Sequence, residues 1–179
     1  MKIRLKNLMF FLVLIVVLSS CSSKKDTSAS EVVAPTNLED AKAPSFVKQD
    51  DFNNINWDDK NSTFKSENIS MFGHKNKLGI IGSSLETDRT LKWFWNFWGV
   101  KNGKLTVVAY HKETTTISSM LMNSNTNKAQ WSQTEIGGPT NGADATLPTT
   151  VKLSKPGKWA LLVYLDDQLF DTIVIKVKE

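Results

Sequence analysis

The sequence predicts an all-β protein, an antiparallel β-sandwich that follows a signal peptide and a flexible tether. From Ser45 onward, short runs of aromatic and β-branched residues alternate with turn residues at close intervals, a pattern typical of antiparallel sandwiches. No amphipathic pattern longer than two helical turns is evident. The first twenty residues are different, because they have the layout of a secretory signal peptide.

The N-terminal segment is too short to be a permanent membrane span. Lys2, Arg4 and Lys6 form a basic start, and the apolar block Leu8–Leu18 follows them. A membrane-spanning helix needs about 20 apolar residues, and this block has about half that length. Residues 1–20 are therefore predicted to be a signal peptide.

The motif Leu18-Ser19-Ser20-Cys21 resembles the bacterial lipobox, in which an aliphatic residue and two small residues precede a cysteine. The resemblance implies that diacylglycerol is attached to Cys21 and that cleavage makes Cys21 the first mature residue. Two acyl chains are enough for stable anchoring. The alternative is an ordinary signal peptide with an incidental cysteine nearby. We expect a lipid-anchored protein on the extracytoplasmic face of the cell membrane.

The single cysteine and the charge balance exclude several kinds of site. With Cys21 used for the anchor, no thiol remains for a disulfide, a zinc cluster or a nucleophile. Removal of the signal peptide takes away three basic residues and lowers the net charge from +4 to about +1. The sequence therefore predicts no metal, no cofactor and no nucleic-acid partner.

Residues 21–45 are predicted to be the lipidated cysteine and a flexible tether, and residues 46–179 the β-sandwich domain. The tether is rich in Ser, Lys, Asp, Ala and Pro and contains no aromatic residue. Such a composition cannot bury enough apolar surface to fold on its own. The domain is long enough to form a core without disulfides.

Four segments have the clearest strand patterns: Leu91–Trp98, Leu105–Lys112, Lys158–Leu165 and Gln168–Lys178. Five weaker candidates are Thr63–Phe72, Lys77–Gly82, Thr116–Met122, Ala129–Ile136 and Thr149–Leu153. Turns are expected at Asn102-Gly103, Pro156-Gly157 and Asp166-Asp167, and in the segment 137–148. The strand Lys158–Leu165 is apolar on both faces, which predicts a central position.

Asn102-Gly103 between two apolar strands predicts a β-hairpin of Leu91–Trp98 with Leu105–Lys112. A plain two-residue loop would leave both faces mixed, so we favour one extra residue, a bulge, at Gly99. That register predicts one core face made of Leu91, Trp93, Trp95, Phe97, Leu105, Val107 and Ala109. The opposite face then holds Lys92, Phe94, Asn96, Trp98, Thr106, Val108, Tyr110 and Lys112.

This opposite face is the candidate binding site, represented by Phe94, Trp98 and Tyr110. Rigid aromatic rings beside polar groups are typical of recognition surfaces. The alternative is that a neighbouring loop covers these rings. We expect three other tryptophans to pack inside the sandwich. Trp93 and Trp95 alternate onto the core side of their strand, and Trp159 is the third.

No catalytic constellation is evident in the sequence. The two histidines, His74 and His111, share no ligand-type spacing, and no zinc or calcium-loop pattern occurs. We expect His74 to lie in a turn and His111 to be a half-exposed polar residue near a strand end. Adjacent aspartates such as Asp166-Asp167 are expected to be solvated loop residues. The sequence thus predicts that the protein is not an enzyme.

Several segments resemble a group of small lipoproteins of Bacillus-type bacteria. They are "KLGII", "LKWFWNFWG", "LTVVAYHKET", "GGPTNGADATLPTTVKL" and "PGKWALLVYLDDQLFDTIVIKV". The resemblance covers roughly residues 70 to 179 and the lipidated start. It implies one immunoglobulin-like β-sandwich on a lipid tether, but no activity and no catalytic residues. Cys21 is the only functional residue that it transfers.

Two functions from different classes remain open, and an enzyme is the least favoured. The first is a membrane-anchored, non-catalytic binding or interaction module for a protein or cell-wall partner. The second is a structural or envelope-stress accessory lipoprotein without a small ligand. A contiguous exposed aromatic patch would favour the binding module, and an evenly polar surface the accessory role.

Overall fold

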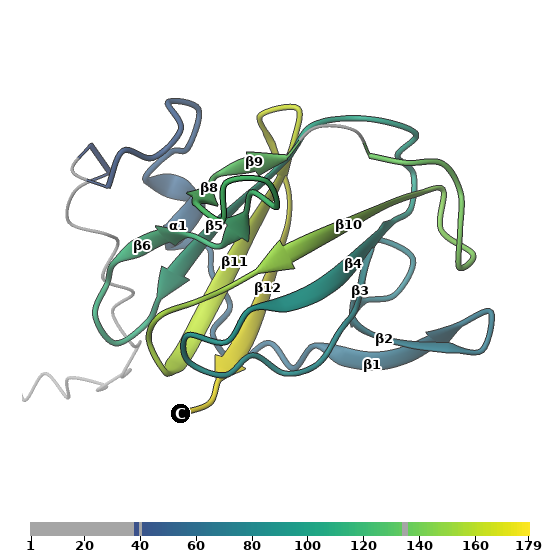
Figure 1. Cartoon of the computed structure of the whole chain (residues 1–179), viewed down its shortest axis with the longest axis horizontal. Helices are drawn as coiled ribbons and strands as arrows, with labels where there is room; N and C mark the ends of the chain where they lie inside the picture. The colour runs from purple at the N-terminus through teal and green to yellow at the C-terminus, as the bar shows by residue number, and fades with distance from the viewer. Residues whose placement is uncertain (1–37, 40, 134–135) are drawn as a thin grey trace, which may run out of the picture. The chain divides into compact units, whose positions relative to one another are not determined.

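The computed structural model describes residues 38–39, 41–133 and 136–179, and these form two antiparallel sheets. The seven-stranded sheet has the order β1 (Ser62–Ser66), β2 (Ile69–His74), β3 (Leu78–Ile81), β4 (Leu91–Phe97), β10 (Ala145–Val151), β7 (Leu121–Met122), β8 (Ala129–Gln130). The five-stranded sheet has the order β12 (Gln168–Val177), β11 (Gly157–Leu165), β5 (Leu105–His111), β6 (Ile117–Ser119), with β9 (Ser132–Gln133) also paired to β5. In Figure 1, β10 crosses in front of β11 and β12. The predicted antiparallel, immunoglobulin-like sandwich is confirmed.

The core lies between the two sheets and is built by alternate residues of their strands. On β4, Trp93, Trp95 and Phe97 are buried and point inward, whereas Lys92 and Phe94 are exposed. Leu105, Val107 and Ala109 of β5 belong to the same buried cluster. Every member of the predicted core face is thus in or against the core, because side chains of a strand alternate between its two faces.

The predicted hairpin between β4 and β5 is wrong, although its core face is right. β4 pairs with β3 and β10, and β5 pairs with β11 and β6, so the two strands belong to different sheets. A two-residue type I′ turn needs a positive φ at both central residues. Gly103 has a φ of 146°, but Asn102 is not among the residues with positive φ. The segment after Gly99 therefore crosses between sheets, and no bulge pairing forms there.

The predicted turn at Asp166-Asp167 is confirmed. Both residues have positive φ, 45° and 66°, and Leu165 pairs directly with Gln168. β11 then lies between β12 and β5, as its two apolar faces predict. Three of the weaker candidates differ from expectation, because each holds two strands. Thr63–Phe72 is split by a turn at Glu67 and Asn68 into β1 and β2, Thr116–Met122 contains β6 and β7, and Ala129–Ile136 contains β8 and β9. The segment 137–148 is not all turn either, because β10 begins at Ala145.

A segment before the first strand covers the outer face of the five-stranded sheet. We call residues 46–60 the strap; it includes the only helix among the described residues, α1 (Asp50–Asn53). The strap and the sheet share a second buried cluster, made of Val47, Phe52, Ile55, Trp57, Val108, Tyr110, Ile117, Ala160, Leu162, Tyr164 and Val174. Figure 1 shows α1 beside β5 and β6.

The chain contacts the domain before the predicted boundary at residue 46. Leu38, Ala41 and Ala43 are half-buried and pack against the second cluster. These apolar residues lie among polar ones, so the composition of the segment did not indicate this packing. The boundary itself stays a prediction, as does the tether, most of which lies outside the described residues.

Candidate functional site

The predicted binding residues Phe94, Trp98 and Tyr110 do not share one face. Phe94 points outward from the seven-stranded sheet and is 43% exposed, and Trp98 is half-buried. Tyr110 belongs to the five-stranded sheet, where Phe52 and Trp57 of the strap cover its ring and leave it 1% exposed. Because β4 and β5 are in different layers, their outward residues lie on opposite sides of the sandwich. The predicted three-residue face is therefore wrong.

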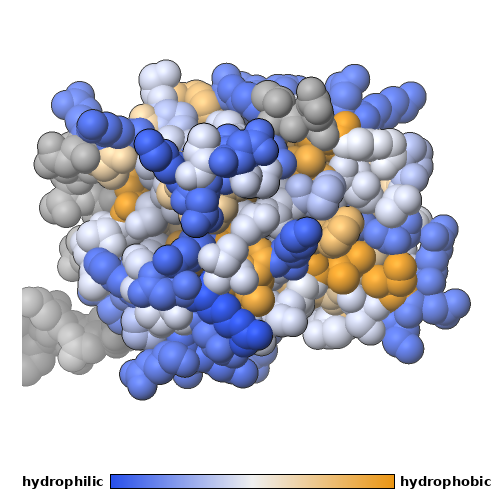
Figure 2. All heavy atoms as spheres, viewed as in Figure 1, coloured by the Kyte–Doolittle hydropathy of each residue, from blue (hydrophilic) through white to orange (hydrophobic). Residues whose placement is uncertain are grey.

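What remains on the seven-stranded sheet is an apolar outer surface, which we call the outer patch. It consists of Phe64, Ile81, Phe94, Trp98 and Pro148, which are exposed or half-buried. Ile81, Phe94 and Pro148 form its clearest part, because direct pairing of β3, β4 and β10 aligns them in one row across the sheet. Figure 2 shows apolar side chains gathered on this side of the molecule, over β3 and β4.

The remaining members of the outer patch pack over Gly79. The rings of Phe64 and Trp98 are 6.1 Å apart. A Cβ at Gly79 would lie 2.8 Å from the sulfur of Met71 and 2.9 Å from Phe64, so the bare glycine makes room for this packing. The indole N–H of Trp98 donates to the Gly142 carbonyl at 2.7 Å. These contacts fix the position of the Trp98 ring at this end of the patch.

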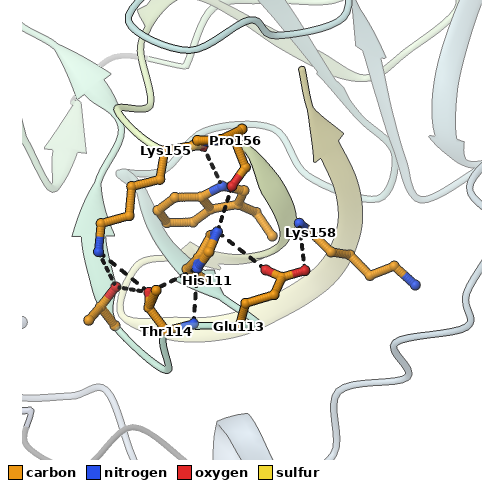
Figure 3. Close-up of polar contacts among 8 residues, drawn as sticks. His111, Glu113, Thr114, Lys155, Pro156 and Lys158 are labelled. Carbon is orange, nitrogen blue, oxygen red and sulfur yellow. Dashed lines mark hydrogen bonds and ion pairs between the residues drawn. The ribbon is translucent and has the colours of Figure 1, made fainter. Parts of the chain in front are cut away.

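His111 lies at the end of β5, where Figure 3 shows it between two turns. The residue is 4% exposed, which corrects the expected half-exposed position. The Thr114 backbone N–H donates to Nδ1 at 3.1 Å, so the other ring nitrogen, Nε2, carries the hydrogen and donates to the Pro156 carbonyl at 2.8 Å. The ring also packs edge-on against Trp159, with centroids 4.6 Å apart.

A hydroxyl, an imidazole and a carboxylate meet at this point. The Thr114 Oγ1 atom is 2.8 Å from Nδ1 of His111, and the Glu113 carboxylate is 3.3 Å from Nε2. These groups resemble a catalytic triad in type. Here, however, Glu113 and Thr114 follow the histidine by two and three residues in one turn, and the histidine is almost fully buried. The arrangement joins the turn after β5 to the turn before β11.

His74, the last residue of β2, lies between two carboxylates, which sequence reasoning missed. Its Nδ1 atom is 2.8 Å from Asp171 on β12, and its Nε2 atom is 2.8 Å from Asp59 on the strap. Lys77 also contacts Asp171, at 3.1 Å. Burial opposes a charge on His74, but the hydrogen bonds and negative charges of Asp171 and Asp59 outweigh it and raise the pKa above its usual value of 6.5.

Residues 38–39, 41–133 and 136–179 contain no group of three or more His, Cys, Asp or Glu side chains placed to hold a metal ion. Within the same ranges, no helix has the length and apolar character needed to cross a bilayer. Cys21, the predicted lipidation site, lies outside the described residues.

Comparison with known proteins places the domain in a family. A family model for a domain of unknown function, DUF4871, matches residues 46–175, which is most of the chain. The chain belongs to the DUF4871 family. This DUF4871 protein also resembles the crystal structure of a candidate lipoprotein from Bacillus anthracis, with a TM-score of 0.65 and 23% sequence identity. The match covers 76% of this chain and 96% of that one. None of the curated proteins matches the chain.

Proposed function

We propose that this DUF4871 protein is a lipid-anchored lipoprotein on the extracytoplasmic face of the membrane, with a domain that acts as a non-catalytic interaction module. The Leu18-Ser19-Ser20-Cys21 motif supports the anchor. So does the likeness to the Bacillus anthracis protein, which is itself described as a candidate lipoprotein. The two histidines support a domain without catalysis, because their ring nitrogens already bond to structural partners.

The observation that carries the interaction proposal is the contrast between the two outer faces. The strap packs on the five-stranded sheet and buries Tyr110 and Val108. On the seven-stranded sheet, Phe94 remains 43% exposed in a row with Ile81 and Pro148. Aromatic residues are enriched where proteins bind one another, which favours a protein partner for the outer patch.

Phe94→Ser should weaken binding of the partner. An interface aromatic of the hot-spot class contributes about 2 kcal/mol or more, which corresponds to roughly a 30-fold loss of affinity. The measurement is capture of partners from membrane extracts by the anchored chain, followed by identification of the captured material. Circular dichroism should show an unchanged fold, because the Phe94 ring is largely exposed.

Leu169→Ser is the matched control for this experiment. Leu169 is 41% exposed, close to the value for Phe94, but it lies on β12 in the other sheet. The control should capture the same partners as the wild-type chain. Equal capture by the folded Phe94→Ser chain would contradict the role of the outer patch. Specific capture of a wall polymer in place of a protein would contradict the proposed class of partner.

A further inference from the structure

The contact of His74 with two carboxylates can be complete only when the imidazole is protonated. A carboxylate accepts hydrogen bonds and donates none, whereas a neutral imidazole has one donor nitrogen and one acceptor nitrogen. Both ring nitrogens of His74 are 2.8 Å from a carboxylate oxygen. The imidazolium donates to both, but the neutral ring leaves one lone pair facing a negative oxygen. One of the two contacts must then weaken.

The two carboxylates belong to elements far apart in the sequence. Asp171 is on β12, 97 residues after His74, and Asp59 is in the strap, 15 residues before it. Asp59 lies two residues after Trp57, whose ring packs on Tyr110. We propose that His74 is a pH-sensitive latch that fastens the end of the strap to β2 and β12. The latch is closed at acidic pH and opens as the pH rises.

The contact with Asp59 is the one expected to open. The Asp171 side chain is only 6% exposed, and it keeps Lys77 as a partner at 3.1 Å when the histidine loses its charge. The Asp59 side chain is 28% exposed, and among the described residues its carboxylate contacts His74 alone. A neutral ring therefore keeps its hydrogen on Nδ1, toward Asp171, and turns an unprotonated Nε2 toward Asp59.

The surroundings of the latch allow Asp59 to leave. A cavity of about 370 Å³ is lined by Asp59, Asp171, Lys77 and Asp51. A released Asp59 carboxylate can therefore be hydrated there. Asp51 accepts a hydrogen bond from the Tyr164 hydroxyl at 2.9 Å, a second attachment of the strap that does not involve His74. Opening is thus expected at residues 56–60, while the part around α1 stays in place.

The direction of the pH effect follows from the raised pKa of His74. The two hydrogen bonds of His74 stabilise the folded chain fully below the unfolded-state pKa near 6.5. This stabilisation is lost as the pH rises through the higher folded-state pKa. Hydrogen exchange of the wild-type chain, corrected for the intrinsic rate at each pH, measures the opening. Loss of one hydrogen bond to a charged group should lower the protection of residues 56–60 about tenfold between pH 5.5 and pH 8.5.

Two variants separate the latch from other titrating groups. His74→Gln removes the titration, so protection should be low and independent of pH across this range. His74→Arg keeps a permanent charge with several donors, so protection should stay high at pH 8.5. Equal protection of the wild-type chain at both pH values would overturn the proposal. It would also be overturned if His74→Gln kept the wild-type pH dependence.

A measurement on the wild-type chain keeps the test valid if either variant fails to fold. In an NMR titration, the His74 ring and the Trp57 indole N–H should change with one common midpoint above 6.5. A Trp57 resonance that does not move while His74 titrates would show that the strap does not respond to the protonation of the histidine. That result would also overturn the latch.

Discussion

Trp159→Ala is expected to lower the free energy of unfolding by about 3–5 kcal/mol, because it removes a large side chain from the closed core. Trp159 is 0% exposed and lies on β11, between the sheets. Its indole N–H donates to the Lys155 carbonyl at 3.1 Å, and its ring packs on His111. The substitution leaves a cavity, and it also removes the donor for that carbonyl. Both effects destabilise the folded state.

Urea denaturation followed by circular dichroism measures this loss. The whole stability of a small domain is about 5–15 kcal/mol, so the variant should unfold at a much lower urea concentration or fail to fold. Trp98→Ala is a suitable control, because Trp98 is half-buried on the outer surface. Its replacement should lower the free energy of unfolding by less than Trp159→Ala does. A loss below about 1 kcal/mol in Trp159→Ala would contradict the packing described for this ring.

Cys21→Ala is expected to abolish lipid attachment and retention at the membrane. Cys21 is the only cysteine, so no second thiol can accept the diacylglycerol. Each buried methylene of an acyl chain contributes about 0.8 kcal/mol, and two chains are needed for stable anchoring. The loss should therefore be close to complete. Labelling of growing cells with palmitate, followed by fractionation, measures it.

Ser22→Ala, next to the lipidated position, is the control for the anchor experiment. It changes a neighbouring residue and leaves the Leu18-Ser19-Ser20-Cys21 motif intact, so labelling should be normal. The Cys21→Ala chain should accumulate as an uncleaved precursor or be poorly retained. Palmitate labelling at the wild-type level in Cys21→Ala would contradict the anchor. Because the change lies outside residues 46–179, it should leave the domain folded.

The turns at Asp166-Asp167 and Asn102-Gly103 show that turn residues alone do not predict which strands pair. Both were predicted from turn residues between apolar strands, and only the first connects paired strands. β4 instead makes a seven-residue pairing with β10, and β5 makes one with β11. Such pairings form between distant segments, and no property of Asn102 or Gly103 indicates them. The chain passes from one sheet to the other at this turn, which lets the apolar faces of the two sheets pack together.

The outer patch and the His74 latch also differ in how far the sequence could predict them. Phe94 was predicted to point away from the core, and alternation along β4 alone is sufficient for that. Alternation along β5 could not predict that the strap covers Tyr110, because the strap is a distant segment of the chain. The His74 contacts were missed because Asp59 and Asp171 are 15 and 97 residues away from it. No short spacing pattern records that proximity.

The sequence by itself determined the properties that depend on neighbouring residues. These are the signal-peptide layout before Cys21, the strand character of the aromatic runs, and the face on which each strand residue lies. Only the tertiary structure decided which strands pair, which outer face the strap covers, and where His74 finds its carboxylates. Local preferences follow from backbone geometry over a few residues. Pairing and coverage depend instead on burial summed over contacts between distant segments, and only the folded chain brings those segments together.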